Sequence, residues 1–206
     1  MATRKSDASR RYRGSSTEER RAQRREQLIL AAIGVYGERG YRNATVKAVC
    51  AAAGLTERYF YESFANSEAL LVETYRAVTG ALLAELEAAA QAASGGASAK
   101  VRAILDAYLE ALKRDPRSAR VFLVEVAGVS AALDGVFAAS LDAFGLLIAR
   151  TLGGGEGDAL LRTAVIGGVI HLAISWVASG YAAPAGEVAD AAMPLCLLLA
   201  RSTPRR

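Results

Sequence analysis

Apolar residues recur every three or four positions along most of the chain, a spacing that places them on one face of a helix. The first such stripe ends at Gly40, which can adopt the left-handed conformation typical of a helix end. Ser16 and Glu19 match a capping box, in which the hydroxyl and the carboxylate each accept a hydrogen bond from a free amide at the helix start. The pattern therefore predicts a first helix from Ser16 to about Gly40, with an apolar stripe of Leu28, Ala32, Val35 and Tyr36.

Two short helical patterns follow, separated by a glycine. Thr45 is a suitable cap for the first, and Gly54 ends it after barely two turns. The second runs from Thr56 to about Ser63. A much longer pattern, capped by Asn66, continues to about Ala93 and spans about 40 Å at about 1.5 Å per residue.

The small residues from Ala93 to Ser98 interrupt the pattern and predict a linker. The rest of the chain is again helical in pattern, and Pro194 is expected to kink the last helix because it lacks a backbone donor. The sequence thus predicts an all-α protein of about nine helices, in which an N-terminal three-helix domain precedes a helical C-terminal domain. The predicted C-terminal helices are 100–114, 117–129, 131–152, 158–180 and 184–201.

The basic residues concentrate at one end of the chain. Residues 1–25 contain nine Lys or Arg and three Asp or Glu, a net charge of +6, whereas the remaining residues carry −2. Such a segment is typical of a flexible arm that is attracted to a polyanion; a tail that only increases solubility is the alternative. We divide the chain into this arm and the start of the first helix (1–21), an N-terminal domain that contains the two short helices (22–82) and a C-terminal domain (83–206).

Composition excludes several other classes of protein. No apolar signal segment follows the N-terminal charges, so we expect a cytoplasmic protein. Cys50 and Cys196 lie far apart in helical patterns and predict no disulfide framework. The uncharged run 163–186 is long enough to cross a membrane, but its glycines, serines and His171 favour a helix buried in protein. A single histidine, with no phosphate-binding loop, nucleophile elbow or cluster of metal ligands, argues against an enzyme, a metal site or a cofactor.

Two short helices joined by a glycine-containing turn, behind a longer first helix, form the helix-turn-helix pattern, here at residues 45–64. The second helix of such a motif enters the major groove of DNA. The segment from Leu28 to Leu71 resembles the DNA-binding domain of the TetR family of transcriptional repressors. The matching residues are Gly40-Tyr41, Thr45-Val46, Ala52-Ala53-Gly54-Leu55, Tyr61, Phe64 and Glu68-Ala69-Leu70-Leu71.

The resemblance implies a homodimer that binds a near-palindromic double-stranded DNA operator and releases it when a small molecule enters the C-terminal domain. It assigns phosphate contacts to Thr45 and Tyr61, and it places residues 56–59 where the family's recognition helix faces bases and the adjoining backbone. Two positions depart from the family pattern: Arg58 stands where a small residue is common, and Ser67 where a lysine is common. The DNA-binding residues predicted in this way are Thr45, Val46, Lys47, Thr56, Glu57, Arg58, Tyr59 and Tyr61.

The chemistry of the recognition helix suits this role. Arg58 can pair with guanine, Glu57 can accept from a cytosine amine, and the Tyr59 ring can pack on a thymine methyl group. As an alternative, Glu57 and Arg58 are solvated surface charges. Phe60 and Phe64, four residues apart, are predicted to face the core. Further phosphate or minor-groove contacts are available from Arg10, Arg11, Arg13, Arg20, Arg21, Arg24 and Arg25.

The C-terminal half is predicted to bind a small hydrophobic effector, because an apolar pocket with few polar groups suits such a ligand. Glu125 either contacts this ligand or forms a structural ion pair. The candidate effector-binding residues are Tyr108, Phe122, Glu125, Phe137, Phe144, His171 and Trp176.

The last two helices are apolar enough to predict self-association, and the resemblance implies a four-helix dimer interface. Burial of these helices within one chain is the alternative. A dimeric DNA-binding protein that senses no small molecule, or a protein that binds a membrane surface, is the alternative to a ligand-responsive repressor.

Overall fold

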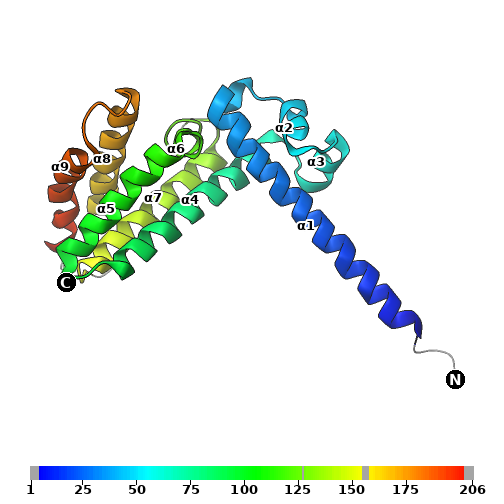
Figure 1. Ribbon diagram of the computed structural model, residues 1–206, viewed down its shortest axis with the longest axis horizontal. Coiled ribbons are helices and arrows are strands. Elements are labelled where there is room, and N and C mark those ends of the chain that lie inside the picture. The colour runs from blue at the N-terminus through cyan, green and yellow to red at the C-terminus, as the bar shows by residue number, and fades with distance from the viewer. Residues whose placement is uncertain (1–4, 127, 155–157, 202–206) are drawn as a thin grey trace. The chain divides into compact units, whose positions relative to one another are not determined.

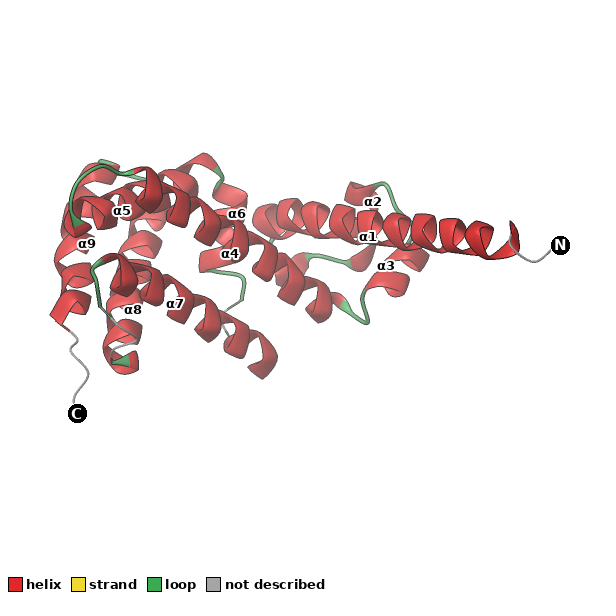
Figure 2. Cartoon of the chain, turned by 90° about the horizontal axis from the view of Figure 1, so that it is seen from below, coloured by secondary structure: helices red, strands yellow, loops and turns green. Residues whose placement is uncertain are grey.

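The computed structural model describes residues 5–126, 128–154 and 158–201, with side chains described from residue 17 to residue 200. All regular secondary structure in the described residues is helical (Figure 1, Figure 2), which confirms the predicted all-α class and the prediction of about nine helices. The nine are α1 (Lys5–Arg39), α2 (Val46–Ala53), α3 (Glu57–Ser63), α4 (Ser67–Ala92), α5 (Ala97–Arg114), α6 (Pro116–Leu123), α7 (Ala131–Thr151), α8 (Ala159–Ala178) and α9 (Ala185–Leu197). Short 3-10 helices cover Tyr41–Asn43 and Leu198–Arg201.

The predicted caps of the middle helices are confirmed. The Thr45 hydroxyl accepts a hydrogen bond from the Ala48 amide at 3.1 Å, at the start of α2. The Asn66 side-chain oxygen accepts one from the Ala69 amide at 2.8 Å, at the start of α4. Each bond satisfies a backbone donor that the helix leaves free, which is why these polar residues mark helix starts in the sequence.

The first helix begins earlier than predicted. α1 already includes Lys5, whereas the Ser16–Glu19 pattern predicted a start at Ser16 and a flexible arm before it. A capping box forms only when its serine lies outside the helix, but serine and arginine inside a helix cost at most about 0.7 kcal/mol each relative to alanine. The residues before Ser16 therefore continue the helix.

The sixth helix is shorter than predicted, because it ends at Leu123 rather than near Val129. Val124 leaves the helical conformation with φ −124° and ψ −44°. Gly128 has a φ of +69°, which no right-handed helix accommodates. The glycine was the local signal for this earlier end.

The chain forms two compact units, Met1–Thr74 and Tyr75–Arg206. The division falls inside α4, and so does the boundary after residue 82 that the sequence suggested. The helix continues through both positions, so its periodic pattern contains no signal for either.

In the first unit, α1 packs on α2 and α3, which also pack on each other. The core of this unit includes Leu28, Tyr36, Val49, Phe60 and Leu70, all buried. The short helices α2 and α3 depend on this core, since helices of two turns are unstable alone in water.

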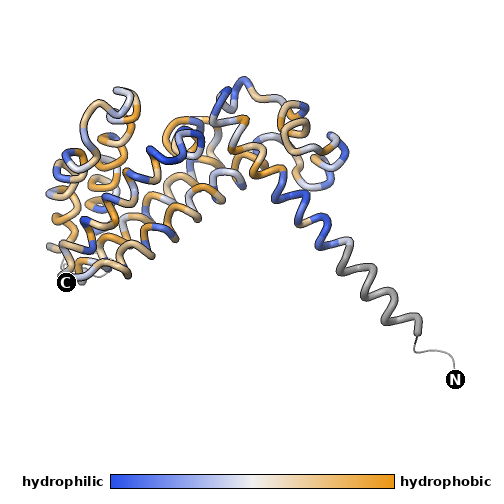
Figure 3. Tube along the Cα trace, viewed as in Figure 1, coloured by the Kyte–Doolittle hydropathy of each residue, from blue (hydrophilic) through white to orange (hydrophobic). Residues whose placement is uncertain are grey.

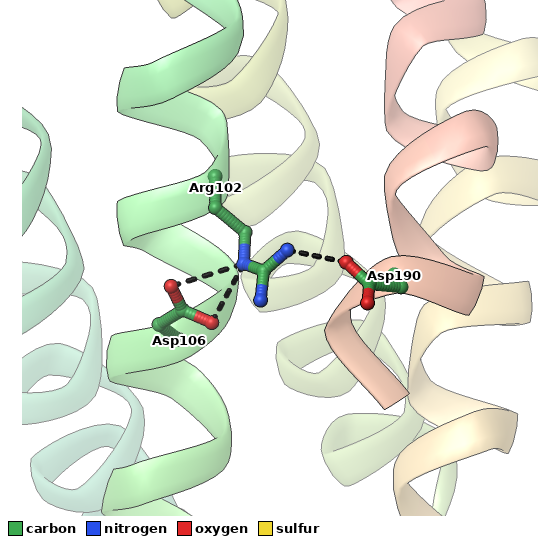
Figure 4. A network of polar contacts seen from close by, with 3 residues as sticks. All are labelled: Arg102, Asp106 and Asp190. Carbon is green, nitrogen blue, oxygen red and sulfur yellow. Dashed lines mark hydrogen bonds and ion pairs between the residues drawn. The ribbon is translucent and has the colours of Figure 1, made fainter. Parts of the chain in front are cut away.

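In the second unit, α5 packs on α9, and α8 packs on both α7 and α9. Arg102 of α5 ties α9 in place (Figure 4). Its Nε donates to both carboxylate oxygens of Asp106, at 2.9 and 3.0 Å, and its Nη1 donates to Asp190 of α9. Cys50 and Cys196 are both free and buried, each in a different unit.

Two of the described helices, α7 and α8, are long and apolar enough to cross a membrane by length and composition alone, and Figure 3 shows their hydrophobic residues. This is weak support for a membrane protein, because a core helix of a soluble protein has the same properties. α8 contains most of the uncharged run noted in the sequence and contributes Val165, Ile166 and Ala173 to the core.

Candidate functional site

The turn between α2 and α3 requires its glycine. Gly54 has φ +67° and ψ 27°, and its amide donates to the carbonyls of Cys50 and Ala51. An added Cβ would meet no atom within 4 Å, so the requirement comes from the backbone conformation and not from crowding. The turn joins the two helices over residues 54–56 and thereby completes a helix-turn-helix.

The start of α2 presents polar groups to solvent. Thr45 and Lys47 are exposed, and Val46 is half-buried. Lys47 has no ion-pair partner among the side chains described. Because the first amides of a helix lack backbone acceptors and carry partial positive charge, this end of α2 favours an anion.

The four aromatic residues of α3 have different environments. Phe60 is fully buried and Phe64 nearly so, with their ring centroids 5.9 Å apart, which confirms that both belong to the core. Tyr61 is 61% exposed, although its ring meets that of Phe60 edge to face at 5.1 Å. Its hydroxyl is therefore presented on a ring that the core holds in place.

Tyr59 is more enclosed than the sequence suggested. It is half-buried, and the Arg24 guanidinium of α1 lies 4.5 Å from its ring centroid. A cation over an aromatic face is attracted by the ring quadrupole. Only a contact between residues far apart in sequence distinguishes Tyr59 from Tyr61, so periodicity alone did not reveal it.

Arg58 of α3 is strongly exposed, with 84% of its side chain in solvent, and it forms an ion pair. Its Nε lies 3.0 Å from Glu62 Oε1 one turn later. Such exposed pairs contribute only about 0.3–0.5 kcal/mol, so breaking this pair costs little. Thr56 and Glu57 beside it are also exposed.

Several arginines of α1 make contacts within the first unit. Arg21 Nη2 donates to the backbone oxygen of Glu62 at 2.7 Å. Arg25 Nη2 lies 2.6 Å from Glu73, and its guanidinium lies 5.0 Å from the Phe64 ring centroid. These arginines, with Arg24, hold α1 against α3 and α4. Arg20 is exposed, whereas the side chains of Arg10, Arg11 and Arg13 lie outside the described residues.

An apolar cavity lies in the second unit, and three of the predicted effector-binding residues line it. Its volume is about 30 Å³ open to the centre of a water molecule, which is room for a water or a small group. Tyr108 is the one lining residue that carries a hydroxyl group. The lining residues are Leu86, Ile104, Leu105, Tyr108, Phe122, Phe144, Ile148, Ile166, Val169 and Ile170.

The Tyr108 hydroxyl is buried and has no hydrogen-bond partner among the described residues. Burial raises the pKa of this phenol, and the neighbouring Tyr75 raises it further, so the group is a neutral donor. A buried polar group without a partner costs about 1–3 kcal/mol. The surface of the cavity is entirely apolar, so the ring of Tyr108 lines it and the hydroxyl does not.

The other four candidate residues lie elsewhere. Glu125 is largely buried and forms an ion pair with Arg120 at 2.8 Å, which fits the structural role considered for it. Trp176 is buried, and its Nε1 donates to the Ala183 carbonyl at 2.8 Å. His171 is exposed on α8, and Phe137 packs against Tyr75 with ring centroids 6.2 Å apart. A helical pattern gives the spacing of these residues but not the rotation of each helix.

Tyr75 links the cavity wall to α4. Its ring stacks on Phe122 at a centroid distance of 6.2 Å, and its hydroxyl lies 2.7 Å from Ser140 Oγ. Ser140 already donates its one hydroxyl hydrogen to the Phe137 carbonyl, so Tyr75 is the donor to Ser140. Burial raises the pKa of Tyr75 to about 12 although the Ser140 bond lowers it. A shift of the Phe122 ring is therefore transmitted to α4 through Tyr75.

The described residues contain no group of three His, Cys, Asp or Glu side chains that is able to hold a metal ion. The arrangement is instead that of a helix-turn-helix unit with exposed polar residues, followed by a helical unit with an apolar cavity.

Comparison with known proteins agrees with this class. Residues 28–74 match the family described as bacterial regulatory proteins, tetR family. No curated protein matches the chain.

Among solved structures, FadR from Bacillus subtilis in complex with stearoyl-CoA is 21% identical, with a TM-score of 0.70 over 86% of this chain and 98% of that one. FadR from Bacillus halodurans is 22% identical, with a TM-score of 0.70 over 89% and 97%. A TetR-like regulator from Rhodococcus sp. RHA1 is 21% identical, with a TM-score of 0.65 over 84% and 93%.

The fold and the motif thus define an all-helical protein with an N-terminal helix-turn-helix. The resemblance seen in the sequence is confirmed: residues 28–74 carry the TetR-type DNA-binding segment, and the chain has the fold of TetR-family transcriptional regulators.

Proposed function

We propose that the chain is a cytoplasmic, ligand-responsive repressor that binds a near-palindromic operator as a homodimer and is released by a small hydrophobic effector. The observation that carries the proposal is the combination of Arg58 and Tyr61, both exposed on a recognition helix that buried Phe60 anchors. Regulators with this fold bind DNA and are not enzymes as a class, which supports a role in recognition.

Dimerisation through α8 and α9 is supported by the apolar surface that these helices expose. Leu160 of α8 is 81% exposed, and Leu198, just after α9, is also exposed. Within the unit the two helices already approach closely, since a Cβ added at Gly168 would lie 3.1 Å from Leu195 Cδ1. Pairing this surface with its copy removes it from water and forms a four-helix interface.

The proposed effector widens the apolar cavity, which otherwise has room only for a water or a small group, and contacts Tyr108, Phe122 and Phe144. The lining contains no charged residue and its surface is apolar, so the expected effector is uncharged and hydrophobic. Stearoyl-CoA in the Bacillus subtilis FadR structure is one example of a ligand bound to this fold. A ligand releases DNA only if it binds the DNA-incompetent state more tightly.

The proposed route of release passes through α4. A ligand that moves Phe122 also moves Tyr75, which stacks on it. α4 begins in the DNA-binding unit and continues into the cavity unit. Half-sites on one face of DNA lie about 34–36 Å apart. If the spacing of the two recognition helices in the dimer changes, only one of them is able to contact its half-site.

For recognition, we expect Arg58→Ala to relax sequence preference by about 1–3 kcal/mol, because a paired guanine loses its donor. Tyr61→Phe is expected to weaken binding to all sequences equally, because a phosphate contact carries no sequence information. Gel-shift titrations measure both variants on duplexes selected from a random pool and on scrambled versions. If Arg58→Ala loses equal affinity on both, Arg58 does not read bases; if wild type selects no sequence, the repressor proposal fails.

For the effector site, we expect Tyr108→Phe to increase the free energy of unfolding by about 1 kcal/mol, because it removes a buried hydroxyl without a partner. The matched variant Tyr75→Phe removes a bonded hydroxyl and is expected to decrease it by about 1 kcal/mol. Urea denaturation measures both. A Tyr108→Phe protein less stable than wild type would contradict the expectation and mean that the hydroxyl has a hydrogen-bond partner.

A further inference from the structure

A long groove runs between α4 and α7, apart from the enclosed cavity. It consists of two adjoining hollows that share Leu83 and Ala143, with volumes of about 600 and 260 Å³ open to the centre of a water molecule. Small residues leave the space open, since Gly80, Ala90 and Ala139 stand where larger side chains would fill it. The groove is therefore large enough for a ligand much bigger than the cavity admits.

Half of the residues that line the larger hollow are apolar, and the polar ones include Gln91 and Thr151. The apolar ones are Leu83 and Ala90 of α4 and Ala143, Leu146 and Leu147 of α7. In the smaller hollow, the two hydroxyl groups are already bonded to their own helices: Thr79 donates to the Tyr75 carbonyl and Ser140 to the Phe137 carbonyl. Neither hydroxyl has a free hydrogen for a polar ligand. Arg76 is the one charged residue of this lining and is exposed, and the surface of the hollow is mostly apolar, so this end accepts an apolar chain.

Two cations line the other end of the groove, against one, Arg76, in the smaller hollow. Lys100 of α5 and Arg150 of α7 both line the larger hollow, and neither has an ion-pair partner among the described side chains. Glu87 is the one acid of that lining, which leaves a net charge of +1. Two unpaired cations beside apolar side chains complement an anionic head group attached to an apolar tail.

We propose that this groove binds an amphiphilic anion, with its carboxylate or phosphate at Lys100 and Arg150 and its tail along Leu83 and Ala143 toward the smaller hollow. The site is distinct from the proposed effector cavity, which neither cation lines. Phe144 lies between the two, since it lines both the cavity and the smaller hollow. The inference goes beyond the proposed repressor function and does not depend on DNA binding.

The test is isothermal titration calorimetry of the full chain without DNA, with decyl amphiphiles below their micellar concentrations. Decyl phosphate and decanoate are expected to bind one per chain, and decyltrimethylammonium at least about tenfold more weakly, because only the sign of the head group differs. Tighter binding of decyl phosphate than decanoate assigns the head group as phosphate, and the reverse assigns it as carboxylate. Equal binding of the cationic amphiphile overturns the proposal.

Variants locate the site. Lys100→Gln and Arg150→Gln are each expected to weaken decyl phosphate binding about two- to fivefold, in line with exposed ion pairs. Lys113→Gln, an exposed lysine at the far end of α5, is the matched control and should leave binding unchanged. Ala143→Phe should weaken every amphiphile about tenfold by filling the groove, whereas Ala138→Phe, exposed on α7 outside both hollows, should not.

Substitutions such as Lys100→Gln carry little risk to folding. If Ala143→Phe fails to fold, the Lys100→Gln and Arg150→Gln variants still test whether the amphiphile binds in the groove. Wild-type affinity in the Lys100→Gln/Arg150→Gln double variant rejects the groove as the anion site. A failure of operator binding in separate experiments leaves this result untouched, because no DNA is present here.

Discussion

Replacing Phe60 by alanine is expected to destabilise the DNA-binding unit by about 3–5 kcal/mol and to abolish DNA binding. Phe60 is fully buried in α3 and contacts the rings of Phe64 and Tyr61. Removing a buried aromatic ring loses its transfer free energy and leaves a cavity. α3 has only seven residues and no stability of its own, so it detaches when its anchor is removed.

Two spectroscopic signals separate the effect on the two units. The single tryptophan, Trp176, lies in the second unit, so its fluorescence follows that unit, whereas far-UV circular dichroism follows all helices. We expect Phe60→Ala to lower the denaturation midpoint in circular dichroism more than in fluorescence. Tyr61→Ala, an exposed aromatic next to it, should change stability by less than about 0.5 kcal/mol. A Phe60→Ala protein as stable as wild type would contradict the anchoring role.

Local signals explain how far the fold was predictable. Thr45 and Asn66 cap their helices with hydrogen bonds to residues three positions later, so a short window of sequence contains the whole interaction. Gly54 is equally local, because its left-handed conformation is a property of one residue. The Ser16–Glu19 pattern fails for the same reason: a local preference for a cap does not prevent a helix from continuing through it.

Long-range contacts explain what the sequence did not reveal at the site. Tyr59 and Tyr61 look equivalent in sequence, but Arg24 covers only Tyr59. Of the residues expected around the effector, Trp176 donates its indole N–H to a loop carbonyl, whereas the ring of Tyr108 lines the cavity. Trp176 lies on α8, whose faces are nearly all hydrophobic, so the sequence barely encodes the rotation of that helix.

The groove between α4 and α7 was also missed, although a signal existed. The signal is a set of small residues on the two helices: Gly80, Ala90, Ala139 and Ala143. In the sequence of a single helix, each of them is only a favourable or tolerated helix residue. Their significance appears only when the two helices lie side by side. Lys100 and Arg150 are fifty positions apart in sequence, and only the fold brings them to the same hollow.

Arg162 is a buried cation that the sequence did not single out. Its side chain is 9% exposed, and both Nε and Nη2 lie 2.9 Å from Asp142 Oδ1. Nη1 is buried without a partner among the described residues. Gly145 makes room for it, since an added Cβ there would lie 3.3 Å from Arg162 Cβ. The pair therefore joins α7 to α8 at the cost of desolvating a charge.

We expect Asp142→Ala and Arg162→Met to change stability in opposite directions. Asp142→Ala leaves a buried guanidinium without its carboxylate and should cost about 2–3 kcal/mol, below the usual 3–5 because Asp142 is half exposed. Arg162→Met keeps a long side chain, removes the unpaired Nη1 and leaves an aspartate that water solvates. It should be neutral or stabilising by about 1 kcal/mol. Urea denaturation followed by Trp176 fluorescence measures both variants.

The double variant decides whether this explanation is correct. If the cost of Asp142→Ala comes from stranding Arg162, the combination with Arg162→Met should be about as stable as Arg162→Met alone, so the two effects do not add. Additive losses would instead mean that each residue stabilises the unit through separate contacts. Arg162 lies at the start of α8, the helix proposed to form the dimer interface. Because Arg162→Met is expected to keep the fold, the dimer dissociation constant of this variant measures whether the charge contributes to association.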